Sequence, residues 1–301
     1  MSQSTVLAES NPDSARLKRK QEQSKGFYSR AWRKFRRNRL AVIGLIFVFL
    51  FVAVGIVGPW IAPYPYDFNN YEITYQTPVK GHPFGTDELG RDVFSRLIYS
   101  LHNAVLIAFG AIAIELVVGG LIGSIAAYVG GRLDNILMRI VDIFFAFPVL
   151  LINIILLVIM GRGLITMLIA IGLTSWVGMA WISRGAVVAI REKDFVEAAR
   201  ALGATNWQII RRYIAPNAVA PIIVQLAFGI PSAMMIESSL SAIGMGFAPP
   251  IPSWGNLITS GQKFMWSFPH LLIWPMITFV LVLLAFTFVG DGVRDALDPK
   301  E

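Results

Sequence analysis

The sequence predicts an all-α integral membrane protein with about six transmembrane helices and both termini in the cytoplasm. The first observation is composition: 55% of the 301 residues are hydrophobic and 15% are charged, a balance that is rare in soluble proteins. The second is the presence of six apolar runs near the length of about 20 residues that a transmembrane helix needs. The third is the gathering of Lys and Arg on one side of these runs.

The six predicted spans are separated by polar connections, and the third is the least regular because Pro148 and Asn153 interrupt it. The first 40 residues hold 11 Lys and Arg, whereas the connections on the side opposite the termini hold five in total. Because basic connections stay in the cytoplasm, this asymmetry places both termini there. The predicted spans cover residues 40–62, 101–129, 143–161, 164–187, 217–246 and 270–290.

The spans divide the chain into four parts. Residues 1–39 form a basic tail, 40–100 hold the first span and an external loop, 101–290 form a five-helix core, and 291–301 form a second cytoplasmic tail. Aromatic and basic residues alternate over 26–39, a pattern typical of an amphipathic helix on anionic lipid headgroups. This pattern favours membrane lipid over nucleic acid as the partner of the tail.

The external loop is rich in turn residues and brings three carboxylates close together, at Asp87, Glu88 and Asp92. Their spacing is not that of a calcium loop, and no distal bidentate glutamate follows. We therefore expect a structural turn in which Arg91 pairs with an acidic neighbour, and no metal site.

The second span contains Gly119 and Gly123, whose spacing lets another helix approach closely. Glu115 lies near the middle of the same span, where a charged side chain must face protein or water. We expect Glu115 to be a hydrogen-bonded packing residue, with a place on the wall of a solute pathway as the alternative.

The turn at 130–142 is the smaller of two cytoplasmic connections in the core. Asp134 is expected to cap a short helix in which Arg139 and Asp142 form an i, i+3 ion pair.

The larger connection, 188–216, predicts two short helices. Asp194 and Glu197 have the spacing of a capping box for the first helix, and Thr205 and Gln208 repeat it for the second.

The junction between these helices is expected at Gly203, where a positive φ is wanted, and Pro216 is expected to end the second helix. Apolar residues recur on one side of each helix, and three arginines accompany them. Such a surface is suited to docking a cytoplasmic partner. The residues are Phe195, Ala198, Ala199, Leu202, Trp207, Ile210 and Ile214, with Arg200, Arg211 and Arg212.

The fifth span is the most polar, which favours a role as one wall of a solute pathway, although interhelical hydrogen bonding explains the same residues. A proline-rich stretch follows at 248–255, and an amphipathic piece at 256–266 is expected at the outer interface, with Trp254 and Trp266 at the headgroup level. The candidate lining residues are Gln225, Glu237, Ser238 and Ser241.

Catalytic motifs are missing from the sequence. No lysine is followed by Ser or Thr, which excludes a Walker A loop, and none of the three histidines forms a zinc-binding pair. No nucleophile motif occurs either. We expect a chain that is not an enzyme and holds no cofactor, so that any energy source resides in another polypeptide.

The run Glu197-Ala198-Ala199, followed by Gly203 and Pro216, resembles the EAA loop of permease subunits of binding-protein-dependent ABC importers. It departs from the family pattern before the proline, where Tyr213 and Ala215 replace an aliphatic pair. Further stretches resemble the second permease subunit of the peptide and nickel branch. They are GTDELGRDVFSR at 85–96, PSWG at 252–255 and GDGVRDALDPK at 290–300.

This resemblance implies a type I ABC importer permease fold and a coupling loop that sits in a groove of an ATPase subunit. It also implies a second, different permease subunit as heterodimer partner, one or two ABC ATPase subunits that carry ATP and Mg²⁺, and an extracytoplasmic solute-binding protein. The residues implied in ATPase coupling are Asp194, Glu197, Ala198, Ala199, Gly203, Trp207, Arg211 and Pro216. Those implied on the binding-protein side are Gly85, Thr86, Asp87, Gly90, Arg91, Asp92 and Trp254.

Peptides are the cargo that the branch favours, with nickel, glutathione and oligosaccharides as alternatives within the family. An ungated channel or a membrane scaffold is the rival from another class, but it gives no reason for a capped helix pair at 194–216. An intramembrane enzyme would need a histidine or paired-carboxylate centre, which the spans do not offer.

Overall fold

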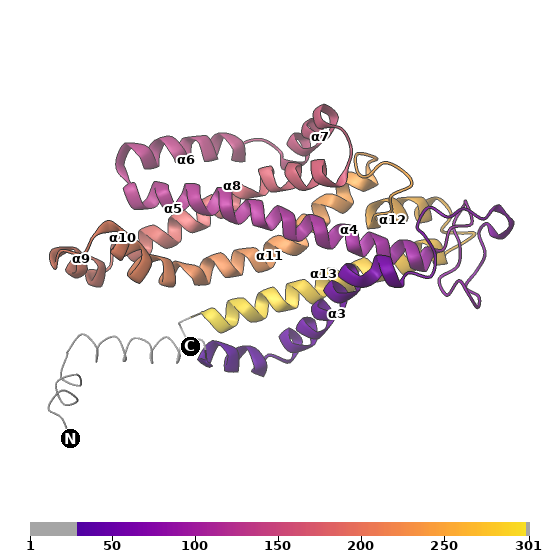
Figure 1. Ribbon diagram of the computed structural model, residues 1–301, viewed down its shortest axis with the longest axis horizontal. Coiled ribbons are helices and arrows are strands. Elements are labelled where there is room, and N and C mark those ends of the chain that lie inside the picture. Colours follow the sequence, from indigo (N-terminus) through magenta and orange to yellow (C-terminus); the bar gives the residue numbers. More distant parts are fainter. Residues whose placement is uncertain (1–28, 299–301) are drawn as a thin grey trace, which may run out of the picture.

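The computed structural model describes residues 29–298, whose regular structure is helical apart from two isolated bridges. Figure 1 shows an elongated bundle of long helices with connecting segments at its two ends. In chain order the elements are α3 (Arg39–Ile61), η1 (Tyr71–Ile73), α4 (Val93–Ile114), η2 (Glu115–Gly119), α5 (Gly120–Val129), α6 (Gly131–Phe145), α7 (Val149–Met160), α8 (Leu164–Arg191), α9 (Asp194–Ala201), α10 (Asn206–Ile209), η3 (Ile210–Ile214), α11 (Ala215–Ala242), α12 (Trp254–Lys263) and α13 (His270–Leu297).

Five of these helices or continuous helical runs are long and apolar enough to cross a membrane, and there are six if the bent pair α6 and α7 counts as one span. The predicted number is therefore confirmed, and so is the interruption of the third span at Pro148, where α6 gives way to α7; Asn153 does not interrupt α7. The two helices meet at an angle of 84°. Pro148 explains the break, because its ring disfavours a helical residue before it. The 12 residues of α7 span only about 18 Å, less than the hydrocarbon core.

The second span begins earlier than predicted, at Val93 rather than at residue 101. Its N-cap is Asp92, whose carboxylate accepts hydrogen bonds from the amide and the hydroxyl of Ser95, both at 2.7 Å. Polar residues in the first turns of α4 lower the mean hydropathy there, so hydropathy alone places the start of the helix too late. Further along, a Cβ at Gly119 or Gly123 would meet the α8 backbone, so the predicted close approach is confirmed.

Two π-helical segments interrupt the long helices. The segment η2 joins α4 to α5, and η3 joins α10 to α11, so that Asn206–Ala242 forms one continuous run. The prediction that Pro216 ends the second short helix is therefore wrong. Pro216 lies in the first turn of α11, where a missing N–H is tolerated, and the amide of Ala215 bonds to the carbonyl of Ile210 across the wider π turn.

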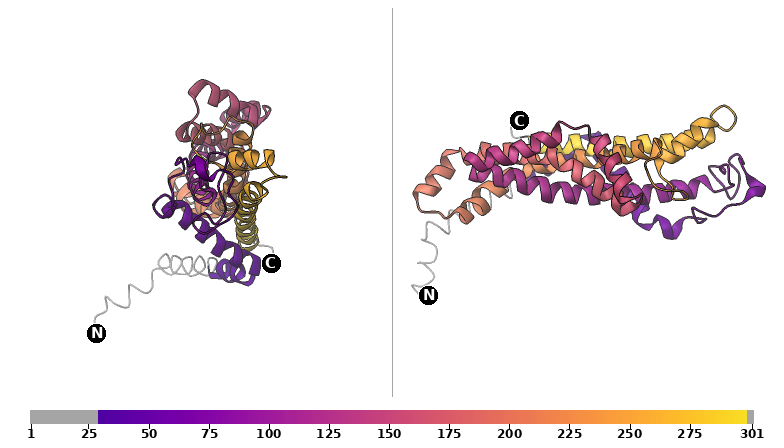
Figure 2. Two further views of the ribbon diagram at one scale, coloured as in Figure 1. Left: turned by 90° about the vertical axis from the view of Figure 1, so that its right-hand side faces the viewer. Right: turned by 90° about the horizontal axis from the view of Figure 1, so that it is seen from above.

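The molecule has two distinct ends (Figures 1 and 2). We call the end formed by α9 and α10 the insert end, and the end formed by residues 62–92 and α12 the loop end. Helix α13 packs against α3 along the side of the bundle. Residues 29–37 are helical and bury Phe35, which agrees with the amphipathic pattern, whereas 26–28 lie outside the described residues.

Candidate functional site

At the insert end, helix α9 stops at a Schellman motif. Gly203 has a φ of 84°, its amide donates to the carbonyl of Arg200 at 3.0 Å, and the amide of Ala204 donates to the carbonyl of Ala199 at 3.0 Å. This junction is where the sequence predicts it. A Cβ at Gly203 would have open space around it, so the glycine is required by the backbone and not by local crowding.

The two predicted capping boxes have different outcomes. Thr205 and Gln208 form theirs: the amide of Gln208 donates to Thr205 Oγ1 at 3.3 Å, and the amide of Thr205 donates to Gln208 Oε1 at 2.8 Å. Asp194 does not cap α9, because Lys193 occupies the N-cap position and makes no side-chain cap. Asp194 and Glu197 lie instead in the first turn, where negative charge is favourable to the helix dipole.

The inner face of the insert packs on the ends of three long helices. Val196, Ile209 and Ile214 are buried there in a small cluster with residues of α5, α8 and α11. One polar contact adds to this packing: the Tyr128 hydroxyl donates to Asn206 Oδ1 at 2.8 Å. Beneath the insert, Arg191 at the end of α8 donates to the carbonyl of Ala127 in α5 at 2.6 Å. The insert is thus fixed to the bundle by its inner side.

The outer face of the insert leaves large apolar side chains in the open. Phe195 is 46% exposed, Leu202 86% and Trp207 67%. Ala199 is buried, so the side predicted as apolar is split between the packed and the open faces. We call the open residues Phe195, Leu202 and Trp207 the insert patch. An apolar patch beside exposed arginines is a typical protein contact site; these arginines are Arg200, Arg211 and Arg212.

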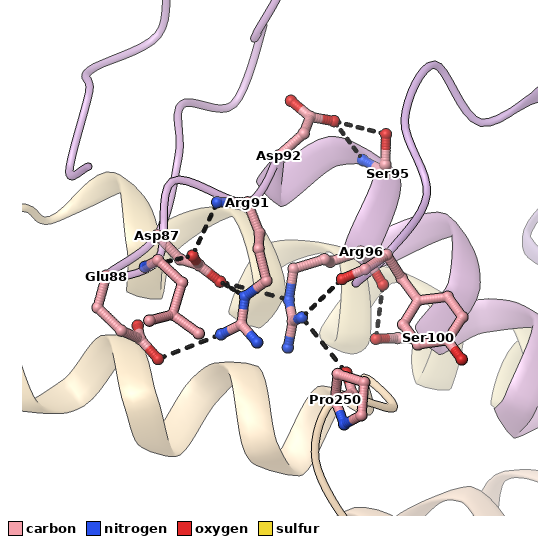
Figure 3. Close-up of polar contacts among 10 residues, drawn as sticks. Asp87, Glu88, Arg91, Asp92, Ser95, Arg96, Ser100 and Pro250 are labelled. Carbon is pink, nitrogen blue, oxygen red and sulfur yellow. Dashed lines mark hydrogen bonds and ion pairs between the residues drawn. The ribbon is translucent and has the colours of Figure 1, made fainter. Parts of the chain in front are cut away.

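At the loop end, charged side chains are buried and paired (Figure 3). Asp87 is the centre of this loop cluster: its carboxylate accepts from Arg91 Nε at 2.7 Å and lies 3.5 Å from Arg96 Nε. Arg91 also donates to Glu88 at 3.3 Å, which confirms the predicted pairing of Arg91 with an acidic neighbour. Arg96 donates to the carbonyls of Tyr66 at 3.0 Å and Pro250 at 3.4 Å, which joins α4 to two loops.

The residues predicted on the binding-protein side thus lie inside the loop end. Thr86, Asp87, Arg91 and Asp92 are each less than a tenth exposed, and Gly85 and Gly90 are buried as well. They shape the loop and do not form its outer surface. Gly90 must lack a side chain because a Cβ there would collide with the carbonyl of Asn70.

Trp254, expected to face the lipid headgroups, is instead buried inside the protein. Its side chain is 1% exposed, its indole donates to Thr278 Oγ1 at 3.3 Å, and its ring lies 5.3 Å from that of Phe279. The amphipathic helix α12 begins at Trp254 and turns this residue inward, while Trp266 beyond the helix is 90% exposed.

A cavity of about 390 Å³ that is open to the surface lies between η2, α8, α11 and the α6–α7 bend. Its polar wall includes Glu115, whose Oε1 accepts from Gln225 Nε2 at 3.1 Å. Glu115 is 2% exposed. Glu115 is buried and hydrogen-bonded, as a packing residue would be, and it also borders the cavity, as a residue of a pathway wall would. Both alternatives for Glu115 therefore stay open.

Of the four residues predicted to line a pathway, the structure brings only Gln225 to this cavity. Glu237 is 1% exposed and accepts hydrogen bonds from Ser238 at 3.2 Å and Ser241 at 2.8 Å. This cluster lies near the C-terminal end of α11, away from Gln225. Both hydrogen bonds lie within α11, so they do not show the interhelical hydrogen bonding that was the alternative for these serines.

A second link lies between α6 and α8. Arg184 binds Asp134 in a bidentate pair, with Nε–Oδ1 at 2.6 Å and Nη2–Oδ2 at 2.7 Å. The prediction that Asp134 caps the short helix is wrong, because Gly130 is the N-cap residue. The ion pairs within 29–298 do not include the predicted pair of Arg139 with Asp142.

The sequence reasoning missed the pairing of Arg96 in α4 and Arg184 in α8, two arginines inside apolar helices. The signal was available, because a charge in such a run requires a partner. Within the described residues no group of three or more His, Cys, Asp or Glu side chains is arranged to hold a metal ion.

Comparison with known proteins places these features in context. Residues 119–301 match the family described as binding-protein-dependent transport system inner membrane component, and residues 26–78 match the N-terminal TM domain of oligopeptide transport permease C.

Curated relatives cover nearly the whole chain. The oligopeptide transport system permease protein OppC of Bacillus subtilis is 37% identical over 93% of this chain and 92% of its own length. The dipeptide transport system permease protein DppC of the same organism is 40% identical over 90% and 85%. The glutathione transport system permease protein GsiD of Pectobacterium atrosepticum is 34% identical over 89% and 90%.

Solved structures share the fold. Two inward-facing crystal forms of the MetNI methionine ABC transporter align with TM-scores of 0.56 and 0.57 at 19% identity. They cover 67% and 68% of this chain and 96% and 97% of the aligned chains.

Proposed function

The chain belongs to the family of inner-membrane permease components of binding-protein-dependent ABC transport systems, and from this premise we propose that it carries peptides across the cytoplasmic membrane. It is a multi-pass membrane protein with the type I importer fold. The support for peptide cargo is the similarity to oligopeptide and dipeptide permeases over about nine-tenths of the chain. The second candidate cargo is glutathione, a small peptide itself, because a glutathione permease is similar at 34% identity.

The observation that carries the mechanism is the insert patch. Phe195, Leu202 and Trp207 are open on a helix pair that is anchored to α5, α8 and α11 on its other side. A partner that binds this patch can therefore move three long helices as a unit. We assign the patch to an ABC ATPase subunit, in which ATP and Mg²⁺ are bound and hydrolysed.

Two further partners complete the proposed assembly. A second permease subunit is expected because this bundle borders an open cavity of only about 390 Å³ and does not enclose a pathway by itself. An extracytoplasmic solute-binding protein is assigned to the loop end, on the side opposite the ATPase. This arrangement puts the insert end and both termini in the cytoplasm, in agreement with the basic N-terminal tail.

The proposed cycle is a rigid-body exchange. Nucleotide binding draws two ATPase subunits together, the insert follows its ATPase, and the attached helices alternate between inward-open and outward-open arrangements. The chain itself contributes no catalytic residue and no cofactor to this cycle.

The test is uptake of labelled di- and tripeptides by cells that lack the chain, compared with cells that carry it intact or with Gly203→Trp. The matched control is Gly161→Trp, a glycine of similar positive φ with open space around it, in the turn after α7. We expect uptake with the intact chain and with Gly161→Trp, and none with Gly203→Trp. Nickel, glutathione and an oligosaccharide are measured in parallel. Uptake of one of these instead of peptides would overturn the cargo, and full activity of Gly203→Trp would overturn the coupling.

A further inference from the structure

We infer that Glu115 is a binding subsite for an ammonium group of the solute in transit, at the wall of the open cavity between η2, α8 and α11. The inference rests on the proposed function and names the part of a peptide that the membrane-spanning bundle recognises.

The carboxylate of Glu115 is held at the cavity by its neighbours. Glu115 begins the π segment η2, and Gln225 of α11 donates to its Oε1 at 3.1 Å. Gly229, one turn after Gln225, leaves room for the other oxygen: a Cβ there would lie 3.2 Å from Oε2. Thus one carboxylate oxygen is fixed by an amide while the second lies beside a position that has no side chain.

Glu115 has no counter-ion among residues 29–298. The ion pairs in this part of the chain do not include it, and no Lys, Arg or His borders the cavity. Burying a carboxylate without a cationic partner is unfavourable, and a single neutral amide offsets only part of that cost. A cationic ligand would supply the missing charge.

Two of the three hydroxyl groups of the cavity wall, those of Thr174 and Ser175 but not that of Ser232, are already committed as donors. Thr174 Oγ1 donates to the carbonyls of Ala170 at 3.1 Å and Ile171 at 3.0 Å, and Ser175 Oγ donates to Ile171 at 2.9 Å. The oxygen lone pairs of Thr174 and Ser175 can still accept hydrogen bonds, as can the amide oxygen of Gln225. The wall therefore offers acceptors, and an ammonium group, with three donors and no acceptor, is the matching ligand.

Aromatic residues complete the match. Phe144 and Phe228 border the same cavity, and the face of an aromatic ring attracts a cation. An anionic group would meet the carboxylate with no basic side chain to offset it. The volume of about 390 Å³ lies within the range of ligand pockets and accommodates the amino end of a peptide.

The test compares uptake of trialanine with that of N-acetyl-trialanine in cells that carry the intact chain, Glu115→Gln or Glu115→Asp. The matched control is Glu237→Gln, because Glu237 is a fully buried carboxylate of α11 that does not border the cavity. Membrane levels of each variant and its retention of the ATPase are measured alongside. These readouts separate a misfolded variant from one that has lost recognition.

We expect Glu115→Gln to lower the uptake rate of trialanine about tenfold or more relative to the acetylated peptide, the size of a lost charged hydrogen bond. Glu115→Asp retains the charge and should recover most of this preference, and Glu237→Gln should leave the ratio unchanged. N-acetyl-trialanine with its central residue replaced by lysine identifies the source of the ammonium group. If Glu115→Gln lowers the uptake of this peptide, the subsite also accepts lysine side chains. If Glu115→Gln leaves its uptake unchanged, the subsite accepts only the amino terminus.

Equal effects of Glu115→Gln on the free and the acetylated peptide would overturn the subsite and leave Glu115 as a packing residue. If the intact chain restores no peptide uptake at all, the proposed function fails and the inference falls with it. The two failures are distinguished by the intact chain alone.

Discussion

The two ends of the molecule differ in which kind of side chain they bury. At the loop end, charged residues are buried and bonded to one another, whereas at the insert end large apolar residues are open to solvent. Asp87 and Arg91 are each less than a tenth exposed. Leu202, in contrast, is 86% exposed and Trp207 67%. The buried charges of the loop end are thus paired within this chain, although Trp266 is 90% exposed there. The open apolar side chains of the insert end have no such cover, and we propose that the ATPase supplies it.

The difference between the two ends should appear in the free energy of unfolding of variants, and the largest loss is expected at the loop end. Replacing Asp87 with Ala leaves Arg91 and Arg96 buried without their shared carboxylate. Breaking a buried ion pair from one side costs about 3–5 kcal/mol. We expect a matching fall in the free energy of unfolding of the purified chain, measured by denaturation in detergent.

The control for this prediction is Glu88→Ala. Glu88 bonds the same arginine, at 3.3 Å, but its side chain is 34% exposed. Its loss should cost about 0.5 kcal/mol, as is usual for exposed ion pairs. Equal losses for Asp87→Ala and Glu88→Ala would show that the loop cluster is not the rigid element described above.

An intermediate effect is expected at the second helix of the insert. Thr205→Ala removes the cap of α10 and should cost about 1 kcal/mol. Gln208→Ala loses only the return bond to the Thr205 amide and should cost less. Both values come from the same denaturation measurement, and a larger loss for Gln208→Ala would contradict the assignment of Thr205 as the cap.

The smallest effect on stability is expected at the insert patch, where it contrasts most with the effect on transport. Trp207→Ala removes a side chain that is 67% exposed, so the free energy of unfolding should change by less than about 0.5 kcal/mol. Peptide uptake should nevertheless fall at least tenfold, because the ATPase contact is lost. Retention of the ATPase in the purified complex is measured alongside, with Trp266→Ala as the control, since Trp266 is 90% exposed at the opposite end. Equal retention of the ATPase by the two variants would remove the patch from the mechanism.

Local features could be predicted from the sequence, and the comparison of the two ends shows why. Gly203, Thr205 and Gln208 act through bonds within a few residues, so their spacing alone indicates the turn and the cap. Asp194 is the exception, because capping geometry is decided by the chain that enters the helix, and here that residue is Lys193.

Long-range features could not be predicted in the same way. Arg96 bonds to Pro250, and Arg184 to Asp134, across distances in sequence that no local pattern encodes. The continuation of the chain through Pro216 depends on the π segment η3, for which the sequence has no comparable signal. The burial of Trp254 likewise follows from the packing of α12 on α13.

The most direct test of the central claim is cross-linking from the insert patch. The chain has no cysteine, so a cysteine introduced by Trp207→Cys is the only thiol of this subunit. In native membranes, a short thiol-to-amine cross-linker should join Trp207→Cys to an ABC ATPase subunit, and the same reagent should give no such adduct with Trp266→Cys. An ATPase adduct from Trp266→Cys, or none from Trp207→Cys in an assembly that retains its ATPase, would contradict the account.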